Sequence, residues 1–233
     1  MYLVIVKFYL EFFIKACYNR CVRYQTVSER SFVLNYIITI SRQHGSGGKE
    51  IGELLSKKLG IPVYDNTLIQ LAAEKSGFSE EHFRDYDKHA SNSFLYSLVR
   101  GFQYHQNTTS AWSLEDKIYA TQTGVIRELA EKGPCIIIGR CADYILSEQP
   151  GLVKIFVYGS LDARAERVAA REGISKEDAI SKIKSTDKRR QNYYNYHADT
   201  KWGDATNYNL CIDSSFCGTE KAADIIYEFL NKN

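Results

Sequence analysis

Four short apolar runs rich in β-branched residues recur along the chain, separated by longer segments with helical periodicity. Such runs are typical of strands that are buried on both faces, as in a parallel sheet covered by helices. The runs are 36–40, 135–138, 153–158 and 208–213. The segments between them predict helices over 49–59, 66–75, 114–132, 161–172, 175–196 and 220–230. This alternation predicts a three-layer α/β/α sandwich with a parallel sheet.

Glycines mark the predicted helix ends, and one long segment lacks a clear pattern. Gly60, Gly133 and Gly173 each follow a charged last turn, where helices commonly end. The segment of about 77–113 is rich in Ser, Asn, His, Tyr and Phe and shows weak periodicity. We expect it to form short helices that cap one end of the sheet.

The first 34 residues differ from the rest of the chain. They are apolar and aromatic, but Lys7, Glu11 and Lys15 interrupt every stretch before it is long enough to cross a bilayer. A signal peptide fits poorly, because no apolar region precedes a small-residue cleavage site. Two interpretations stay open, an additional amphipathic or interface segment and an extension without a role in activity. We expect no stable membrane insertion, and we treat 35–233 as one domain.

Composition and charge exclude several classes of protein. The chain has 233 residues, of which 44% are hydrophobic, enough for one substantial core. Its 30 basic residues nearly balance 28 acidic ones, and it has no RNP-like strand or GXXG clamp, so we expect no nucleic-acid partner. The six cysteines include no C-x-x-C pair, and no histidine stands at metal-ligand spacing to them, which disfavours a zinc site. Such thiols favour the reducing cytoplasm. The sequence does not indicate the oligomeric state.

A glycine-rich turn joins the first apolar run to the first helix and ends in Lys49. Three glycines in it let consecutive backbone N–H groups converge on an anion, and the following helix adds the positive end of its dipole. These are Gly45, Gly47 and Gly48. Ser46 between them either donates its hydroxyl to a phosphate or caps the helix. The place of the turn, after a buried strand, favours phosphate binding over tight strand–helix packing, the other common role of such turns.

Basic residues follow two of the other apolar runs. Arg140 lies just beyond 135–138, where its planar set of donors suits an anion, although a lone arginine there is also a common surface salt-bridge partner. Arg164, Arg167 and Arg171 share one helix face by their spacing, and a solvated basic surface is the simplest interpretation. Positive charge at 187–190, followed by tyrosines, either closes over a nucleotide or forms a polar helix hairpin.

The order of these motifs resembles the cytidylate kinase-like family, relatives of bacterial cytidylate kinase among the nucleoside monophosphate kinases. The resemblance covers about 35–233 and implies a fold of the P-loop kinase type, with a helical lid at about 173–206 and an acceptor-side helical insertion at about 77–113. The motifs that carry it are Ser41-Arg42 before Gly45-Ser-Gly-Gly-Lys49, then Ile61-Pro-Val-Tyr-Asp65, Ile138-Gly-Arg140, the run 153–158 with its Arg-bearing helix, Asp187-x-x-Arg190 and Cys211-Ile-Asp213-Ser214.

The resemblance also implies roles for individual residues. The glycine-rich loop would bind the phosphates of ATP, and an arginine of the helix 161–172 would lie over the adenine. The ATP-binding set is Gly45, Ser46, Gly47, Gly48, Lys49, Arg167 and Arg171. The acceptor-binding set is Arg42, Asp65, Arg140, Asp187 and Arg190. Lys49, Arg140 and Arg190 would stabilise the transferred phosphoryl group.

The chain also departs from the family pattern around the expected magnesium ion. Ile138 and Cys141 stand where cytidylate kinases carry aspartates, and Gln43 replaces a loop glycine. Glu50 and Ile51 stand where hydroxyl residues normally follow the lysine. The remaining Mg²⁺ candidates are Glu50, Asp65 and Asp143.

Three functions follow from this comparison. The first is an ATP- and Mg²⁺-dependent phosphotransferase for a small phosphorylated acceptor, such as the pyrimidine nucleoside monophosphates CMP and dCMP. The second is a nucleotide-binding regulatory protein with little or no turnover. The third is a kinase of a non-nucleotide metabolite, with the tyrosine-rich segment 96–119 as the determinant of its acceptor.

Overall fold

A computed structural model describes residues 36–65 and 114–232 of the chain, which divides into two units after Leu34. All described residues lie in the second unit, Asn35–Asn233. Its core is a five-stranded sheet in the order β2-β3-β1-β4-β5, and every paired strand is parallel. The strands are β1 (Ile37–Arg42), β2 (Val63–Tyr64), β3 (Cys135–Ile138), β4 (Leu152–Tyr158) and β5 (Leu210–Asp213). The predicted α/β fold with a parallel sheet is confirmed.

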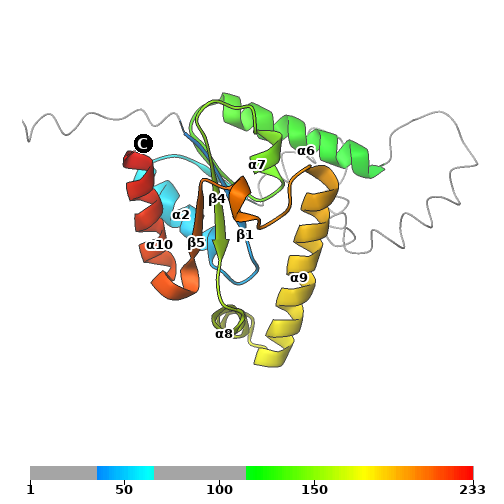
Figure 1. The fold of residues 1–233 in the computed structure, drawn as a ribbon, viewed down its shortest axis with the longest axis vertical. Helices are drawn as coiled ribbons and strands as arrows, with labels where there is room; N and C mark the ends of the chain where they lie inside the picture. Colours follow the sequence, from blue (N-terminus) through cyan, green and yellow to red (C-terminus); the bar gives the residue numbers. More distant parts are fainter. Residues whose placement is uncertain (1–35, 66–113, 233) are drawn as a thin grey trace, which may run out of the picture. The chain divides into compact units, whose positions relative to one another are not determined.

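Helices cover both faces of this sheet (Figure 1). On one face, α2 and α10 bury Ile51, Leu55 and Ile226 against the strands, and on the other α6 and α7 bury Ile126 and Ile145. Burying these branched side chains is the main source of stability for such layers. The helices are α2 (Gly48–Leu59), α6 (Leu114–Glu131), α7 (Ala142–Ile145), α8 (Leu161–Glu172), α9 (Lys176–His197) and α10 (Ser214–Asn231).

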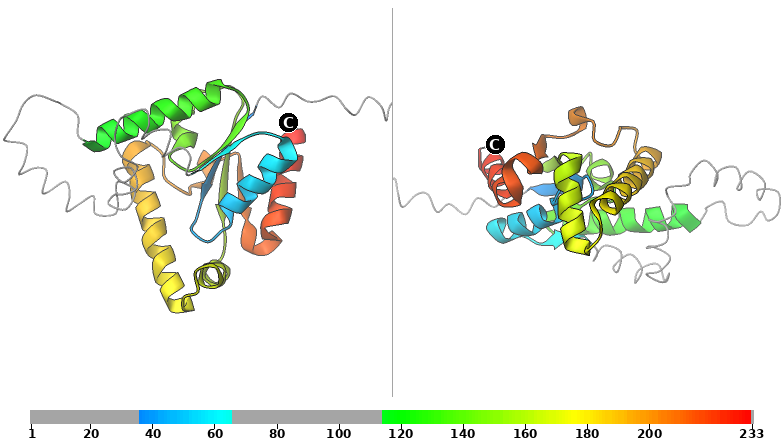
Figure 2. Two further views of the ribbon diagram at one scale, coloured as in Figure 1. Left: turned by 180° about the vertical axis from the view of Figure 1, so that it is seen from behind. Right: turned by 90° about the horizontal axis from the view of Figure 1, so that it is seen from below.

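The strand register brings three connections to one edge of the sheet. Ile40 of β1 pairs with Ile138 of β3 and with Ile155 of β4, so the carboxyl ends of these strands lie side by side. The loop after β1, the turn after β3 and the start of α8 therefore meet at that edge. Figure 2 shows α8 crossing the end of the sheet, with α9 leading away from it at a steep angle. This edge is where open α/β sheets bind ligands.

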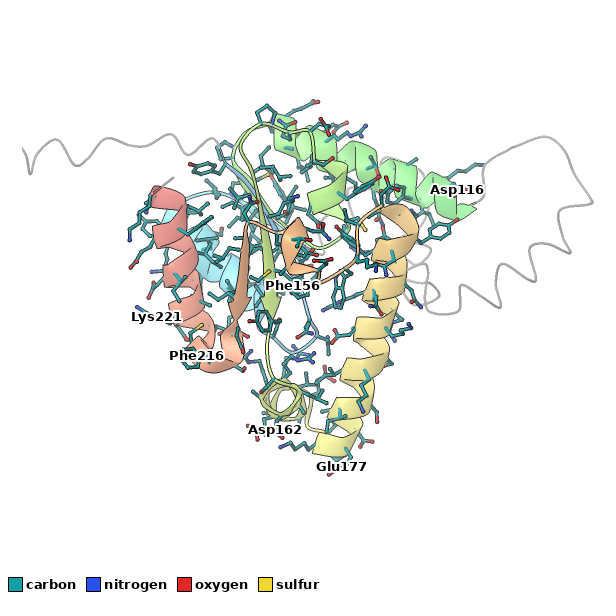
Figure 3. All side chains as sticks on the ribbon, in the orientation of Figure 1. Asp116, Phe156, Asp162, Glu177, Phe216 and Lys221 are labelled. Atoms are coloured by element: carbon teal, nitrogen blue, oxygen red, sulfur yellow. The ribbon has the colours of Figure 1, made fainter. Side chains whose placement is uncertain are left out.

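Residues 173–206, the predicted lid, form the turn after α8, the long helix α9 and the loop that follows it. Two parts of α9 are buried: Ala179 and Ile183 pack on α8, and Tyr194 reaches the core under α6. The following loop is held by β4, because the ring of Phe156 lies 5.4 Å from that of Trp202 and 5.0 Å from that of Tyr208 (Figure 3). In the described residues, no helix has the length and hydrophobicity needed to span a membrane.

Several element boundaries differ from those predicted. The two-residue strand β2 was not predicted, because it is too short to carry a periodic pattern. β5 begins at Leu210, two residues later than expected, after a 3-10 turn at Ala205–Asn207. α10 begins at Ser214, six residues early, because Asp213 caps it and the helix continues through a kink at Gly218. The predicted helix at 66–75 and the insertion at 77–113 lie outside the described residues.

Candidate functional site

The loop between β1 and α2 requires glycine at two positions. Gly45 and Gly47 have φ of 80° and 76°, in the left-handed region that side chains disfavour. A Cβ on Gly45 would lie 2.8 Å from the carbonyl oxygen of Arg164, and a Cβ on Gly47 would lie 2.5 Å from Cγ2 of Thr219. The loop is therefore compressed between α8 and α10, and it leads into the N-terminus of α2. The first amides of a helix have no partner within it, so they are available to an anion.

Side chains inside the loop hold its shape. The hydroxyl of Ser46 is fully buried, 2.9 Å from the carbonyl oxygen of Gln43 and 3.1 Å from that of Val157. It does not cap α2, whose N-cap position is Gly47 without a side-chain hydrogen bond, so that interpretation is wrong. The carboxamide oxygen of Gln43 accepts a hydrogen bond from the amide of Gly159 at 3.2 Å. Gln43, which replaces a glycine of the motif, thus connects the loop to the end of β4.

Arginines of α8 bind the outer side of the same loop. Arg164 is nearly buried and donates from Nη1 to the carbonyl oxygen of His44 (3.1 Å) and to Asp187 (2.7 Å). Arg167 donates from Nη1 to the carbonyl oxygen of Gly45 (3.1 Å). Arg171 is half exposed and pairs with its neighbour Glu172. The solvated interpretation of this helix face is therefore wrong for Arg164, and Arg167 lies beside the loop as an ATP-binding residue would.

Three of the predicted anion-binding arginines gather at the edge of the sheet. Arg190 of α9 donates from Nη1 to the carbonyl oxygen of Arg42 at 2.9 Å. Burial, together with the charges of Arg42 and Arg140, lowers the pKa of Arg190 to about 9, against the opposing effect of Asp187 and Asp65. Arg190 binds the backbone of Arg42, and the guanidinium of Arg42 lies over Gly139, next to Arg140, so the three arginines share one region. An anion bound there would relieve their mutual repulsion.

The turn that carries Arg140 has an uncommon backbone. Arg140 and Cys141 have φ of 63° and 54°, so two consecutive residues with side chains are left-handed. Each such residue costs on the order of 1–3 kcal/mol. The turn is closed by a hydrogen bond from the amide of Ala142 to the carbonyl oxygen of Gly139, and Gly139 is overlaid by the guanidinium of Arg42. Arg42 therefore lies against the turn that positions Arg140.

Asp65 connects the predicted donor and acceptor sides. It follows β2, and its carboxylate lies 3.6 Å from Nζ of Lys49 and 3.4 Å from Nη2 of Arg42. Lys49 also lies 3.9 Å from Glu53 and is about half exposed. Lys49 at the loop and Arg42 at the arginine group are therefore bridged by one carboxylate.

The three magnesium candidates differ in their surroundings. Asp143 is buried and its two oxygens accept hydrogen bonds from Ser41 (3.4 Å) and Tyr194 (2.8 Å), so it does not fit as a ligand. Glu50 accepts from the hydroxyl of Thr219 at 3.1 Å. Asp65 lies beside Lys49 and fits a magnesium ion held by one carboxylate, phosphates and water. Within 36–65 and 114–232, no cluster of three or more metal-ligating side chains occurs.

The buried hydrogen bond between Asp143 and Tyr194 should make a contribution to stability that depends on pH. Burial raises the pKa of Asp143, and the hydroxyl of Tyr194 is the largest influence that counteracts the rise. When folding raises the pKa of a carboxyl group, the folded protein becomes less stable as the pH rises through the folded pKa of that group. Tyr194→Phe should raise this pKa further, so it should lower the free energy of unfolding by about 1–3 kcal/mol at pH 8. The loss should be smaller at pH 5, as measured by urea denaturation.

Tyr193→Phe is the matched control for this prediction. The hydroxyl of Tyr193 donates to the carboxamide oxygen of Gln122 at 3.2 Å, and this group does not titrate. Its loss of stability should be the same at both pH values. Equal losses at pH 5 and pH 8 for Tyr194→Phe would contradict the assigned role of Asp143.

Sequence comparisons with known proteins identify one family. A sequence profile of the cytidylate kinase-like family matches residues 37–216. The cytidylate kinase of Methanopyrus kandleri is 27% identical over 204 residues, which are 84% of this chain and 93% of that protein. The cytidylate kinase of Pyrococcus abyssi is 29% identical over 202 residues, with coverage of 82% and 96%.

Solved structures share the fold. An uncharacterized protein from Eubacterium ventriosum superposes with a TM-score of 0.63 at 28% identity, covering 85% of this chain and 99% of that one. A shikimate kinase from Bacteroides thetaiotaomicron has a TM-score of 0.50 at 14% identity, with coverage of 84% and 98%. At that identity the second likeness concerns the fold alone.

Proposed function

Since the chain belongs to the cytidylate kinase-like family, we propose that this nucleotide kinase transfers a phosphoryl group from ATP to a pyrimidine nucleoside monophosphate such as CMP or dCMP. The observation that carries the proposal is the convergence at one sheet edge of the Lys49 loop with Arg42, Arg140 and Arg190. Two anion-binding regions side by side are what a reaction between two phosphate-bearing substrates requires.

On the donor side, the amides at the start of α2 would bind the ATP phosphates and Lys49 would bridge them. Gly45, Gly47 and Gly48 let the loop pack tightly against Arg164, Thr219 and Arg42, and this packing fixes the shape in which the loop would receive the phosphates. One of two arginines of α8 would lie over the adenine, either Arg167, held against the loop, or Arg171, farther along the helix. Ser46 contributes through its backbone, because its hydroxyl is used within the loop.

On the acceptor side, Arg140 and Arg190 would bind the phosphate of the acceptor, with Arg42 beside them. Phosphoryl transfer depends on positioning and on stabilising the charge of the transferred group, and an attacking phosphate oxygen needs no strong protein base. Lys49, Arg140 and Arg190 would supply that stabilisation. Asp65 would hold the magnesium ion, which neutralises charge on the donor phosphates when bound.

A coupled assay of ADP formation tests the proposal, with ATP, Mg²⁺ and each of CMP, dCMP, UMP and AMP. We expect turnover with at least one pyrimidine nucleotide and less with AMP. No ADP above background with any of the four would refute the nucleotide kinase. Turnover only with a non-nucleotide metabolite would instead support the third function, a metabolite kinase whose acceptor is determined by the segment 96–119.

A regulatory nucleotide-binding protein is the second candidate. It is favoured by the two acidic groups that are engaged elsewhere, Glu50 with Thr219 and Asp143 with Tyr194. ATP binding in calorimetry without turnover on any acceptor would support it.

The four cysteines in the described residues are free thiols, which supports a cytoplasmic location for either function.

A further inference from the structure

Three elements meet at the peptide groups of His44 in the phosphate loop. The amide of His44 donates to Oδ1 of Asp187 at 2.6 Å, and its carbonyl oxygen accepts from Nη1 of Arg164 at 3.1 Å. The same Nη1 donates to Oδ2 of Asp187 at 2.7 Å. Nε of Arg164 donates to the carbonyl oxygen of Gly159 at 2.9 Å. This closed set of bonds joins the loop after β1 to α8 and α9.

The set is shielded from water and contains one charge of each sign. The side chains of Arg164 and Asp187 are 9% and 16% exposed. If either oxygen of Asp187 turned toward a substrate, the amide of His44 or the guanidinium of Arg164 would lose a partner in a largely desolvated place. Such a loss is far costlier than breaking a surface contact.

Helix α9 holds the loop on both sides of Gln43. Asp187 binds the amide of His44, and Arg190, nearly one helical turn later, binds the carbonyl oxygen of Arg42. The peptide groups before and after Gln43 are thus fixed by one helix, and Gly45 follows directly in its left-handed conformation. The direction of the amides that reach the donor phosphates depends on this arrangement.

We propose that Asp187 and Arg164 form a clamp that positions the phosphate loop for ATP, and that Asp187 acts on the donor rather than as a contact of the acceptor. The clamp rests on the proposed function only for the identity of the nucleotide. Asp187 and Arg164 are positioning residues, since they act through the backbone of His44. Helix α9 is thereby coupled to ATP binding through the loop.

Asp187→Asn tests the clamp, because it keeps the shape but turns an N–H₂ toward either the amide of His44 or Arg164. Calorimetry with ATP alone should show affinity weakened by about 10- to 100-fold. The KM for ATP should rise in parallel, while the KM for CMP stays within about twofold of wild type. Hydrogen exchange at the His44 amide should become faster. A raised KM for CMP with unchanged ATP affinity would overturn the clamp.

Lys176→Met is the matched control. Lys176 of α9 lies 3.2 Å from Glu166 of α8, so it links the same two helices, and the two side chains are 40% and 66% exposed. ATP affinity should not change. Arg164→Lys is a second, milder variant, because one ammonium group can pair with Asp187 but cannot also reach both carbonyl oxygens; we expect a smaller loss of ATP affinity. Unchanged ATP affinity in this variant would also overturn the clamp.

The outcomes separate the clamp from the proposed function. If wild type binds ATP without transferring a phosphoryl group, the kinase proposal fails and the calorimetric comparison of variants still decides the clamp. If wild type turns over CMP and Asp187→Asn keeps its ATP affinity, the clamp fails and the kinase stands.

Discussion

Replacing Lys49 with methionine should lower the rate of phosphoryl transfer by roughly 100- to 1,000-fold. The ammonium group of Lys49 lies at the end of the loop and 3.6 Å from Asp65, and in the proposed reaction it would be the mobile positive charge that binds the donor phosphates. Its ion pairs are about half exposed at the lysine end and contribute little to stability. The variant should therefore fold normally and lose activity, as measured by ADP formation and thermal unfolding.

Lys57→Met is the control, because Lys57 is exposed on the last turn of the same helix α2. It removes the same charge far from the loop and should keep full turnover. If Lys49→Met retained more than about a third of wild-type activity, Lys49 would have no part in the reaction.

Replacing Arg140 with methionine should raise the KM for the acceptor on the order of 100-fold while leaving ATP affinity nearly unchanged. The reason is that Arg140 belongs to the group of three guanidinium groups, and truncating one side of a desolvated charge pair costs about 3 kcal/mol. Arg140→Lys should be intermediate, because it keeps the charge and loses the planar pair of donors. Steady-state kinetics with each substrate varied in turn would separate the two effects.

The exposed Arg127 of α6 provides a control for Arg140, since Arg127→Met removes an equal charge from the same protein. It should change neither KM. An equal rise in KM for ATP and for the acceptor in Arg140→Met would contradict the assignment of Arg140 to the acceptor.

The sheet was predictable because its central strands are buried on both faces. β3 coincides with the predicted run, and β1 and β4 differ from theirs by at most two residues at either end, since a parallel strand covered by helices must be apolar throughout. β2 carries no such signal in two residues. The start of α10 was missed because Asp213 was predicted to be the end of a strand, whereas its carboxylate accepts a hydrogen bond from the amide of Ser215 and caps a helix.

The site was predictable where a residue follows a strand and hidden where it depends on a distant partner. Arg140 lies just beyond the end of β3, and Lys49 ends the glycine-rich loop that follows β1, so a local pattern locates both. Arg164 looked like a solvated helix residue because helical spacing gives a face but not the element packed against it. Its partner Asp187 lies 23 residues farther along the chain, on the next helix. Thr219, beside Gly47 and Glu50, likewise had no local signal.

The left-handed turn at Arg140 and Cys141 lowers the stability of the fold but positions a side chain that the proposed activity needs. A chain optimised only for thermal stability would place glycine or asparagine at both positions, where such a backbone is tolerated. At position 140 that exchange would remove the guanidinium whose direction the turn determines. Consensus or thermostability engineering should therefore leave residue 140 fixed and accept its conformational penalty. Position 141 carries the same penalty with a buried thiol, so it is the place where stability could be increased without touching the arginine.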